Sequence, residues 1–254
     1  MATLLDVDWA TGSTCSATNL KDGVFTTIGD EGSCCSEFGI GTDGPGGRNY
    51  FKIILPSSDG SNYIRGHTSL GNPATLYVRM WFRYLATMGY GWHNVVLEDS
   101  LGGTPLYILR GAGASPSFSI EHGGGWYDYI DGITTNQWYR LELKITGGGG
   151  SSGAIYVRLD GVDITNRMYY ADTGWLTDDN GGITLPQLNY FSMWSYYHDE
   201  GPGERQNIAG VKITDGPDWI GGDNMKLNGT MQENMSKING VSLSSIDKII
   251  GYDF

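Results

Sequence analysis

Hydrophobic and polar residues alternate along several segments of the chain. In residues 74–87 (ATLYVRMWFRYLAT) every second side chain from Leu76 is apolar, and the side chains between them include Arg79, Trp81 and Arg83. A period of two over this length is that of a β-strand with one face in a hydrophobic core. The segment therefore predicts a strand whose other face carries arginine and tryptophan.

Residues 137–146 (QWYRLELKIT) show the same alternation, with Tyr139 and Leu141 on the predicted core side. Residues 154–165 (AIYVRLDGVDIT) contain two short strand-like arms around the pair Asp160-Gly161. Asp-Gly is a preferred pair in type I′ turns because both positions tolerate a positive φ. We therefore predict a β-hairpin at this position.

Strand-like segments recur along the rest of the chain, separated by turn-forming residues. They are 48–56 (RNYFKIILP), 61–69 (SNYIRGHTS), 92–99 (WHNVVLED), 104–111 (TPLYILRG), 116–123 (PSFSIEHG), 189–201 (NYFSMWSYYHDEG) and 206–221 (QNIAGVKITDGPDWIG). No segment of useful length has the period of a helix. The pattern predicts an all-β protein, a two-sheet antiparallel jelly-roll β-sandwich.

Composition and charge narrow the classes of function. The chain of 254 residues has 40 glycines, and its 16 lysines and arginines stand against 28 acidic residues, giving a formal charge of −12. Nucleic-acid surfaces need a basic stripe, and none is visible in the sequence. No apolar run reaches the length of a membrane span, and the N-terminal residues lack the basic and apolar regions of a secretory signal.

Three of these segments together resemble a known family. NQWYRLELKIT, GAIYVRLDGVDIT and the late NIAGVKITDGPDWIG are similar to strands of the concanavalin A-like lectin/glucanase jelly roll, the laminin-G-like group. The resemblance covers Leu4 to Gly222. It implies that the N-terminal segment LLDVDWATG is an edge strand that pairs with the last strand of the domain. This scaffold hosts lectins, hydrolases, lyases and structural modules, so the fold alone implies no single activity.

Aromatic residues are the candidates for glycan contact. Sugars stack on flat rings, and the chain has 8 tryptophans and 16 tyrosines. We expect strands 74–87 and 189–201 to be neighbours that line a groove, and the glycine-rich segment EHGGGWYDY to be an exposed loop. An alternative is that Trp81 and Trp194 fill the core. The predicted glycan-binding residues are Arg79, Trp81, Arg83, Trp126, Tyr127, Trp194, Tyr196 and His198.

An enzymatic function is the less favoured alternative. Retaining glucanases of this superfamily carry two alternating acids on one strand, and no such strand is present. The segment YFSMWSYYH is similar to an alginate-lyase motif, which implies Tyr196 as proton donor and acceptor, Arg65 on the uronate carboxylate, and His67 or His93 as base. The arginine- and glutamine-bearing strands of that family are missing. The alternative is thus a secreted polysaccharide lyase that cleaves polyuronates by β-elimination.

Cysteine and acidic residues give no metal or cofactor prediction. Cys15, Cys34 and Cys35 are free thiols or form one disulfide from Cys15 to one of the other two. Calcium is common in the superfamily, and Asp6, Asp8 and Asp215 are oxygen-bearing candidates, as is the loop 178–180. Acidic residues at turns are more often turn formers than ligands, so no metal site is claimed.

The C-terminal residues form a repeat. Lys226, Lys237 and Lys248 are eleven residues apart, and each is followed by an aliphatic residue, one more residue and a glycine. Units this short cannot bury an apolar side alone, which predicts a docking or oligomerisation tail at 223–254 after a jelly-roll domain at 1–222. The repeats resemble those at the ends of phage and other virion structural proteins; the alternative is a disordered polar tail. The predicted assembly residues are Ile238, Val241, Leu243, Ile246, Ile249 and Ile250.

Together these features predict a non-enzymatic virion surface protein, a head decoration or a tail-associated adhesin. Its jelly roll would contact cell-surface or environmental glycans, and its tail would bind other virion proteins or its own copies. We expect synthesis in a host cytoplasm without a signal peptide, and neither nucleic-acid binding nor membrane insertion. A third possibility is a purely structural module without a ligand.

Overall fold

The computed structural model describes the larger part of the chain. The described residues are 2–7, 25–29, 38–55, 61–66, 69–85, 92–100, 105–111, 118–122, 125–129, 133–170, 174–177, 182–196 and 203–216, followed by the short strands between 226 and 253. Among these residues there is no α-helix; the helical segments are the 3₁₀ turns η2 (Pro45–Gly47) and η3 (Thr165–Arg167).

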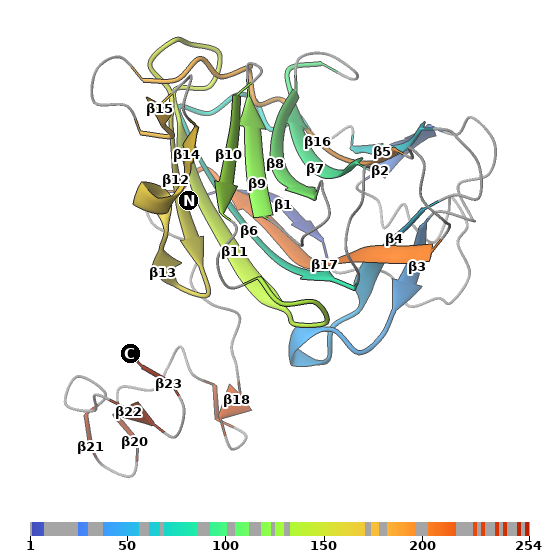
Figure 1. Ribbon diagram of the computed structural model, residues 1–254, viewed down its shortest axis with the longest axis vertical. Coiled ribbons are helices and arrows are strands. Elements are labelled where there is room, and N and C mark those ends of the chain that lie inside the picture. Colours follow the sequence, from blue (N-terminus) through green and yellow to red (C-terminus); the bar gives the residue numbers. More distant parts are fainter. Residues whose placement is uncertain are drawn as a thin grey trace. The chain divides into compact units, whose positions relative to one another are not determined.

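Residues 1–220 form two antiparallel sheets, which we name sheet A and sheet B (Figure 1). Sheet A has the order β13 (Val162–Asp163), β12 (Ala154–Leu159), β11 (Tyr139–Thr146), β6 (Thr75–Tyr84), β17 (Gly203–Thr214), β4 (Tyr50–Leu55) and β3 (Phe38–Gly41), and β1 (Thr3–Val7) also pairs with β17. Sheet B has the order β15 (Gly174–Trp175), β14 (Tyr169–Tyr170), β10 (Gly125–Tyr129), β9 (Phe118–His122), β8 (Pro105–Gly111), β7 (Trp92–Glu98), β16 (Tyr190–Tyr196), β5 (Ser61–Gly66) and β2 (Phe25–Gly29).

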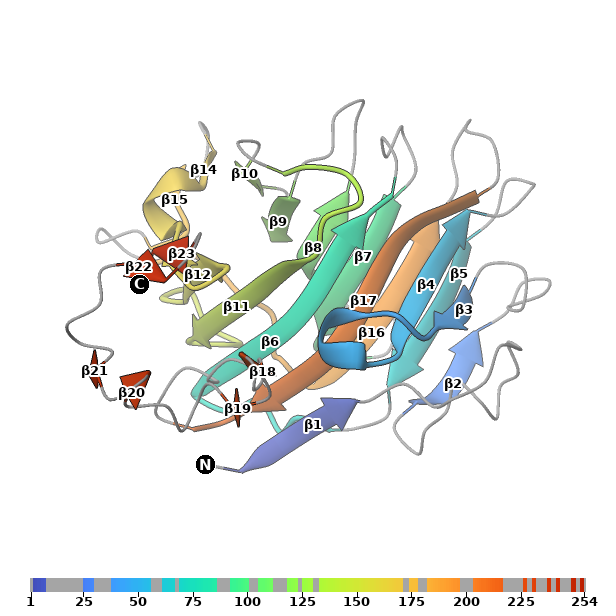
Figure 2. The same ribbon diagram turned by 90° about the horizontal axis from the view of Figure 1, so that it is seen from below.

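The two sheets pack face to face around one hydrophobic core, with sheet A in front in Figure 2. Phe82 of β6 in sheet A lies at the centre and has no exposed surface. Its ring centroid is 5.6 Å from that of Tyr139 on the neighbouring strand β11, and 5.8 Å from that of Phe118 on β9 of sheet B. Aromatic contacts across the interior thus join the two layers into a jelly-roll β-sandwich, as predicted.

The strand and hairpin predictions from the sequence are confirmed. Each expected strand segment contains a strand, and Asp160 and Gly161 have positive φ values of 51° and 84° in the turn between β12 and β13. The N-terminal strand β1 pairs with β17, with Asp6 opposite Lys212 and Val7 opposite Val211. The two ends of the sandwich domain therefore meet in one sheet, as the family resemblance implies.

Residues Gly221–Phe254 form a second compact unit. Its described part consists of three short hairpins, namely β18 (Lys226–Leu227) with β19 (Thr230–Met231), β20 (Lys237–Ile238) with β21 (Val241–Ser242), and β22 (Lys248–Ile249) with β23 (Tyr252–Asp253). Each repeat lysine begins a hairpin, and the same register recurs, with Leu227 opposite Thr230 and Ile238 opposite Val241. The sequence repeat is therefore a structural repeat. Across the described residues, no helix is long and apolar enough to cross a membrane.

Replacing Phe82 with alanine tests the position of the core. Because Phe82 is fully buried between the two sheets, Phe82→Ala should lower the free energy of unfolding by about 3–5 kcal/mol. Val162 is 63% exposed in the hairpin, so Val162→Ala should change it by less than about 0.5 kcal/mol. Urea unfolding of both variants measures the difference, and equal effects would place the core elsewhere.

Candidate functional site

Sheet A carries cationic and aromatic side chains on its outer face, which we name the basic face. On β6 the core side chains Val78 and Met80 alternate with Arg79, Trp81 and Arg83. Strand alternation places these three on the side away from sheet B. Trp81 is half-buried and outside the core cluster, so it does not fill the space between the sheets.

The register of the strands aligns the outer side chains in rows across sheet A. One row consists of Arg158, Glu142, Arg79, Lys212 and Asp6; a second of Arg140, Trp81, Ala209 and Tyr50; a third of Arg83, Asn207 and Lys52; and a fourth of Tyr156, Lys144, Tyr77 and Thr214. Directly opposed side chains on one face are close enough to interact. The basic face thus carries cationic and aromatic side chains, with some acidic and neutral ones between them, in adjacent rows.

The most organised part of the basic face is the Arg83 cluster, formed by Tyr50, Arg83 and Trp138. The Arg83 guanidinium lies 4.7 Å from the Trp138 ring centroid and 5.2 Å from that of Tyr50. The two rings meet edge to face at 5.4 Å. Tyr50 occupies its place because the opposite residue is Gly41: a Cβ there would lie only 2.1 Å from the Tyr50 ring. Burial raises the pKa of the Tyr50 phenol.

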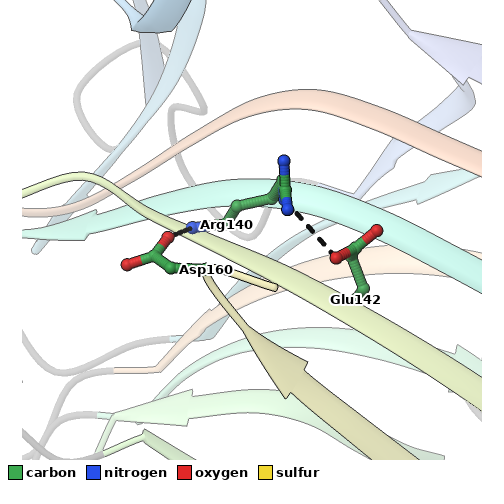
Figure 3. A network of polar contacts seen from close by, with 3 residues as sticks. All are labelled: Arg140, Glu142 and Asp160. Atoms are coloured by element: carbon green, nitrogen blue, oxygen red, sulfur yellow. Dashed lines mark hydrogen bonds and ion pairs between the residues drawn. The ribbon is translucent and has the colours of Figure 1, made fainter. Parts of the chain in front are cut away.

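A second arginine–tryptophan pair lies beside this cluster. The Arg140 guanidinium is 6.0 Å from the Trp81 ring centroid, and its Nε lies 3.4 Å from Glu142 Oε2 (Figure 3). The backbone N–H of Arg140 donates to Asp160 Oδ1 at 2.7 Å, and the Asp160 N–H donates to the Arg140 carbonyl at 2.8 Å. The turn between β12 and β13 thereby fixes the start of β11, and with it the orientation of Arg140.

Two charged residues of the basic face are almost completely covered. Arg79 and Glu142 are directly paired and are each only 4% exposed. Burial raises the pKa of the Glu142 carboxyl, although the positive charges of Arg140, Arg158 and Arg79 oppose the rise. Burial also raises the pKa of Asp160. For the Glu142 carboxyl, the cost of desolvating its charged form therefore outweighs the attraction of the arginines.

Sheet B has a row of polar residues on its outer face that the sequence did not predict. Ser192 Oγ donates to Glu98 Oε1, and both side chains are fully buried. Tyr107 pairs with Val96 on one side and with Glu121 on the other. Glu98 and Glu121 are two strands apart and offset by two residues along the strand, since Tyr107 opposes Val96 and Glu121. The register therefore does not place these two acids directly opposite each other.

The predicted glycan-binding residues do not form one site. Strands β6 and β16 lie in different sheets, so the expectation that they are neighbours lining a groove is wrong. The outward residues of β6 and the row containing Ser192 on β16 face away from each other. The backbone places Trp194 opposite Asn94 and Tyr63 in sheet B, and His198 lies outside the described residues.

The expected glycine-rich loop is a strand. Trp126 and Tyr127 belong to β10, where they pair with Glu121 and Ile120 of β9. The run of three glycines at 123–125 is a turn signal in the sequence, but β10 pairs with β9 and with β14. The expectation that Trp126 and Tyr127 lie in a loop is therefore wrong.

The residues of the lyase alternative are spread over sheet B. Arg65 on β5 pairs with Ser192, four residues from Tyr196, which pairs with Ser61. His93 on β7 pairs with Ser195. Strand alternation assigns this position to the inner face of sheet B, whereas Arg65 and Tyr196 occupy outer-face positions. His67 lies outside the described residues. The backbone register thus separates Arg65 and Tyr196 by about 13 Å along the strand.

Other candidate residues have protein partners or are not described. Lys212 Nζ lies 3.6 Å from Asp6 Oδ2, and the Ala2 N–H donates to Asp215 Oδ1 at 2.7 Å. Asp8, the loop 178–180 and the three cysteines are outside the described residues. Within the part of the chain that the structure describes, no group of three or more histidine, cysteine or acidic side chains is placed to hold a metal ion.

Comparisons with known proteins support the fold. No protein-family model and no curated protein matches the sequence. The structure is similar to "Cellulose induced protein, Cip1", with a TM-score of 0.57, 14% identity, and coverage of 85% of this chain and all of that one. It is also similar to the catalytic domain of a glycoside hydrolase family 131 protein from Coprinopsis cinerea, with a TM-score of 0.52, 14% identity, and coverage of 83% and 95%. The alginate lyase Aly36B matches at a TM-score of 0.47 and 10% identity over 82% and 95%. At these identities, the likeness to the first two structures shows the fold, a two-sheet β-sandwich, and no activity.

The raised pKa of Glu142 predicts a specific pH dependence. The folded protein holds the Glu142 proton more tightly than the unfolded chain does, because the folded-state pKa is raised. The protonated carboxyl therefore contributes its full stabilisation at pH values below the ordinary carboxyl pKa. This contribution is lost as the pH rises through the raised folded-state pKa. Glu142→Gln removes the titration. The unfolding free energy of the wild type minus that of Glu142→Gln should therefore fall as the pH rises from about 4 to 7. A difference that grows with pH would contradict the assigned burial effect.

Proposed function

We propose that this protein binds a polysaccharide through the basic face of sheet A. The observation that carries the proposal is that Trp81 and Trp138 lie outside the core on an outer sheet face, each with an arginine guanidinium held against its ring. Half-buried indole rings on a rigid sheet offer flat apolar surfaces to the C–H faces of sugars, and the nearby guanidinium groups offer donors to their oxygens.

The arrangement of the Arg83 cluster supports binding rather than packing alone. Its rings come from different parts of the chain. The sheet register places Tyr50 opposite Gly41, and the missing side chain of Gly41 leaves room for the Tyr50 ring. Side chains ordered before binding lose little conformational entropy when a ligand arrives. A sheet face that carries ordered side chains in this way suits an extended polymer better than a small molecule, which needs an enclosing cavity.

The fold is a second line of support. The same sandwich is found in the catalytic domain of a family 131 glycoside hydrolase, a protein class that acts on glycosidic bonds. In this chain, the strand register does not bring Arg65, His93 and Tyr196 of the lyase alternative together. We therefore propose a binding function, with the polyuronate lyase as the alternative to be tested.

The tail completes the proposal. We propose that residues 223–254 attach the protein to a virion particle or to its own copies, so that the sandwich is displayed on the virion surface as a head decoration or tail-associated adhesin. In support, the tail consists of equal hairpins of two residues per strand. Isolated two-stranded hairpins are marginal in water, whereas stacked repeats bury their apolar sides against one another or against a partner.

Replacing Trp81 tests the binding face. Trp81→Ala should weaken binding to glycans on an array by about 0.5–1.5 kcal/mol, the size of an aromatic stacking contact. The melting temperature should stay almost unchanged because the ring lies outside the core. Trp194→Ala is the matched change on sheet B and should leave this binding intact. Equal losses for both variants, or none for Trp81→Ala, would overturn the proposed face.

The same protein samples test the alternative. Incubation with alginate and glucuronan should give no rise in ultraviolet absorbance from unsaturated products. A rise that Tyr196→Phe abolishes would make the protein a lyase and reverse the order of the two functions.

Deleting the tail tests its role. Removal of residues 223–254 should leave a folded sandwich that is monomeric by light scattering and is no longer incorporated into particles. Ile238→Asp or Ile249→Asp should mimic the deletion, because burying each aliphatic side chain contributes about 1.5–3 kcal/mol and a buried charge without a partner is costly. Ser245→Asp adds the same charge between hairpins and should have little effect. Unchanged assembly of the truncated protein would show that the tail has no docking role.

A further inference from the structure

We infer that the ligand of the basic face is an acidic polysaccharide, and that Arg83 is the residue that binds its carboxylate or sulfate groups. This inference rests on the proposed function and names the chemical class of the ligand. It follows from the distribution of charge over the sandwich, from the partners of each cation, and from the way in which Arg83 is held.

The charge of the basic face differs in sign from that of the whole chain. The described cations on its outer strand positions are Lys52, Arg79, Arg83, Arg140, Lys144, Arg158 and Lys212. The described acids on the same positions are Asp6, Glu142, Asp163 and Glu204. Asp43 beside Tyr50 and Asp160 beside Arg140 also adjoin the face, so its seven cations stand against six acids. The face has a small excess of cations, while the whole chain has a formal charge of −12. A polyanion is repelled by most of the surface and attracted to this face.

Ion pairs hold Lys52, Lys212 and Arg140 of this set. Lys52 Nζ lies 3.2 Å from Glu204 Oε2, Lys212 lies 3.6 Å from Asp6, and Arg140 lies 3.4 Å from Glu142. These ion pairs neutralise part of the positive charge of the basic face and hold the three side chains in place. Arg83 is different, because its described contacts are with the rings of Tyr50 and Trp138 and no described carboxylate lies within ion-pair distance.

Aromatic rings hold Arg83 without consuming its hydrogen-bonding capacity. Asn207 lies directly across from Arg83 and is fully buried, yet neither its amide oxygen nor its amide nitrogen has a hydrogen-bond partner among the described residues. The buried Nε of Arg83 is also without one. Ring contacts alone therefore orient the guanidinium, and its two Nη groups retain four donors. Such a planar fork matches the two oxygens of a carboxylate or sulfate.

A second ring-held cation lies farther along the same face. Lys144 Nζ is 5.2 Å from the ring centroid of Tyr156, which is 36% exposed, and Lys144 pairs with Tyr77 of β6. Tyr77 and Arg83 are six residues apart on β6, about 20 Å at the rise of a strand. Trp81 and Arg140 lie between these ends. A ligand that uses both cations must be a chain of several sugars that carries repeated acidic groups.

Matched polymers separate acid recognition from sugar binding. We would titrate the full-length protein with polygalacturonate and its carboxyl-reduced form, and with dextran sulfate and neutral dextran, at low and high salt. At least one acidic polymer should bind roughly tenfold or more tightly than its neutral partner, as expected for hydrogen bonds to charged groups. The preference should shrink at high salt because exposed charges are screened. Comparing the two acidic polymers decides between carboxylate and sulfate.

Variants of Arg83 test the assignment to one residue. Arg83→Gln should abolish most of the acid preference, and Arg83→Lys should restore only part of it, because lysine keeps the charge but lacks the planar fork. Arg167→Gln makes the same charge change on the exposed 3₁₀ turn η3 and should leave the preference intact. Circular dichroism and the melting temperature of each variant establish that the fold is retained.

The outcomes distinguish this inference from the proposed function. Equal binding of acidic and neutral polymers, still weakened by Trp81→Ala, would overturn the acidic class of ligand and leave the glycan-binding face in place. An acid preference that survives Arg83→Gln would overturn the role of Arg83. Failure to bind any of the four polymers would overturn both proposals.

Discussion

The structure depends on the position of β6 at the centre of sheet A. This strand pairs with β11 on one side and with β17 on the other, and its inward side chains, including Phe82, meet sheet B in the core. Because successive side chains of a strand point to opposite faces, fixing the inward set also fixes the outward set. A slip of one residue in the register would place Arg79 and Arg83 in the core. The hydrophobic core therefore determines where the cations and rings of the basic face lie.

Opposite charges on neighbouring strands offset part of the desolvation cost at the centre of that face. Arg79 and Glu142 are covered by their neighbours although they belong to an outer sheet surface. Leaving either one unpaired at that depth would cost several kcal/mol, so the opposition of Arg79 and Glu142 across β6 and β11 holds both residues in position. Side chains held by such pairs lose less conformational entropy when an extended ligand binds.

The Arg83 cluster shows how the sandwich builds a site from distant parts of the chain. Gly41 on β3 leaves space for the Tyr50 ring, Arg83 comes from β6, and Trp138 lies just before β11. No two of these residues are neighbours in sequence, and the antiparallel pairing brings them together. On the opposite face of the sandwich, the contact between Glu98 and Ser192 arises in the same way. Both faces consequently combine chemical groups that lie far apart in the sequence.

The sequence by itself determined the local structure. The alternation around Arg79, the turn at Asp160 and the repeat of lysines in the tail each depend on neighbouring residues, and each corresponds to a strand or hairpin. Only the tertiary structure decided the order of the strands, since pairing between distant segments depends on how the whole core packs. For this reason the sequence predicted Trp81 and Trp194 in one groove, whereas the fold places their strands in opposite sheets. Tyr50 and Trp138 carried no local signal, because a ring becomes part of a site only through the partners that the sheet register places beside it.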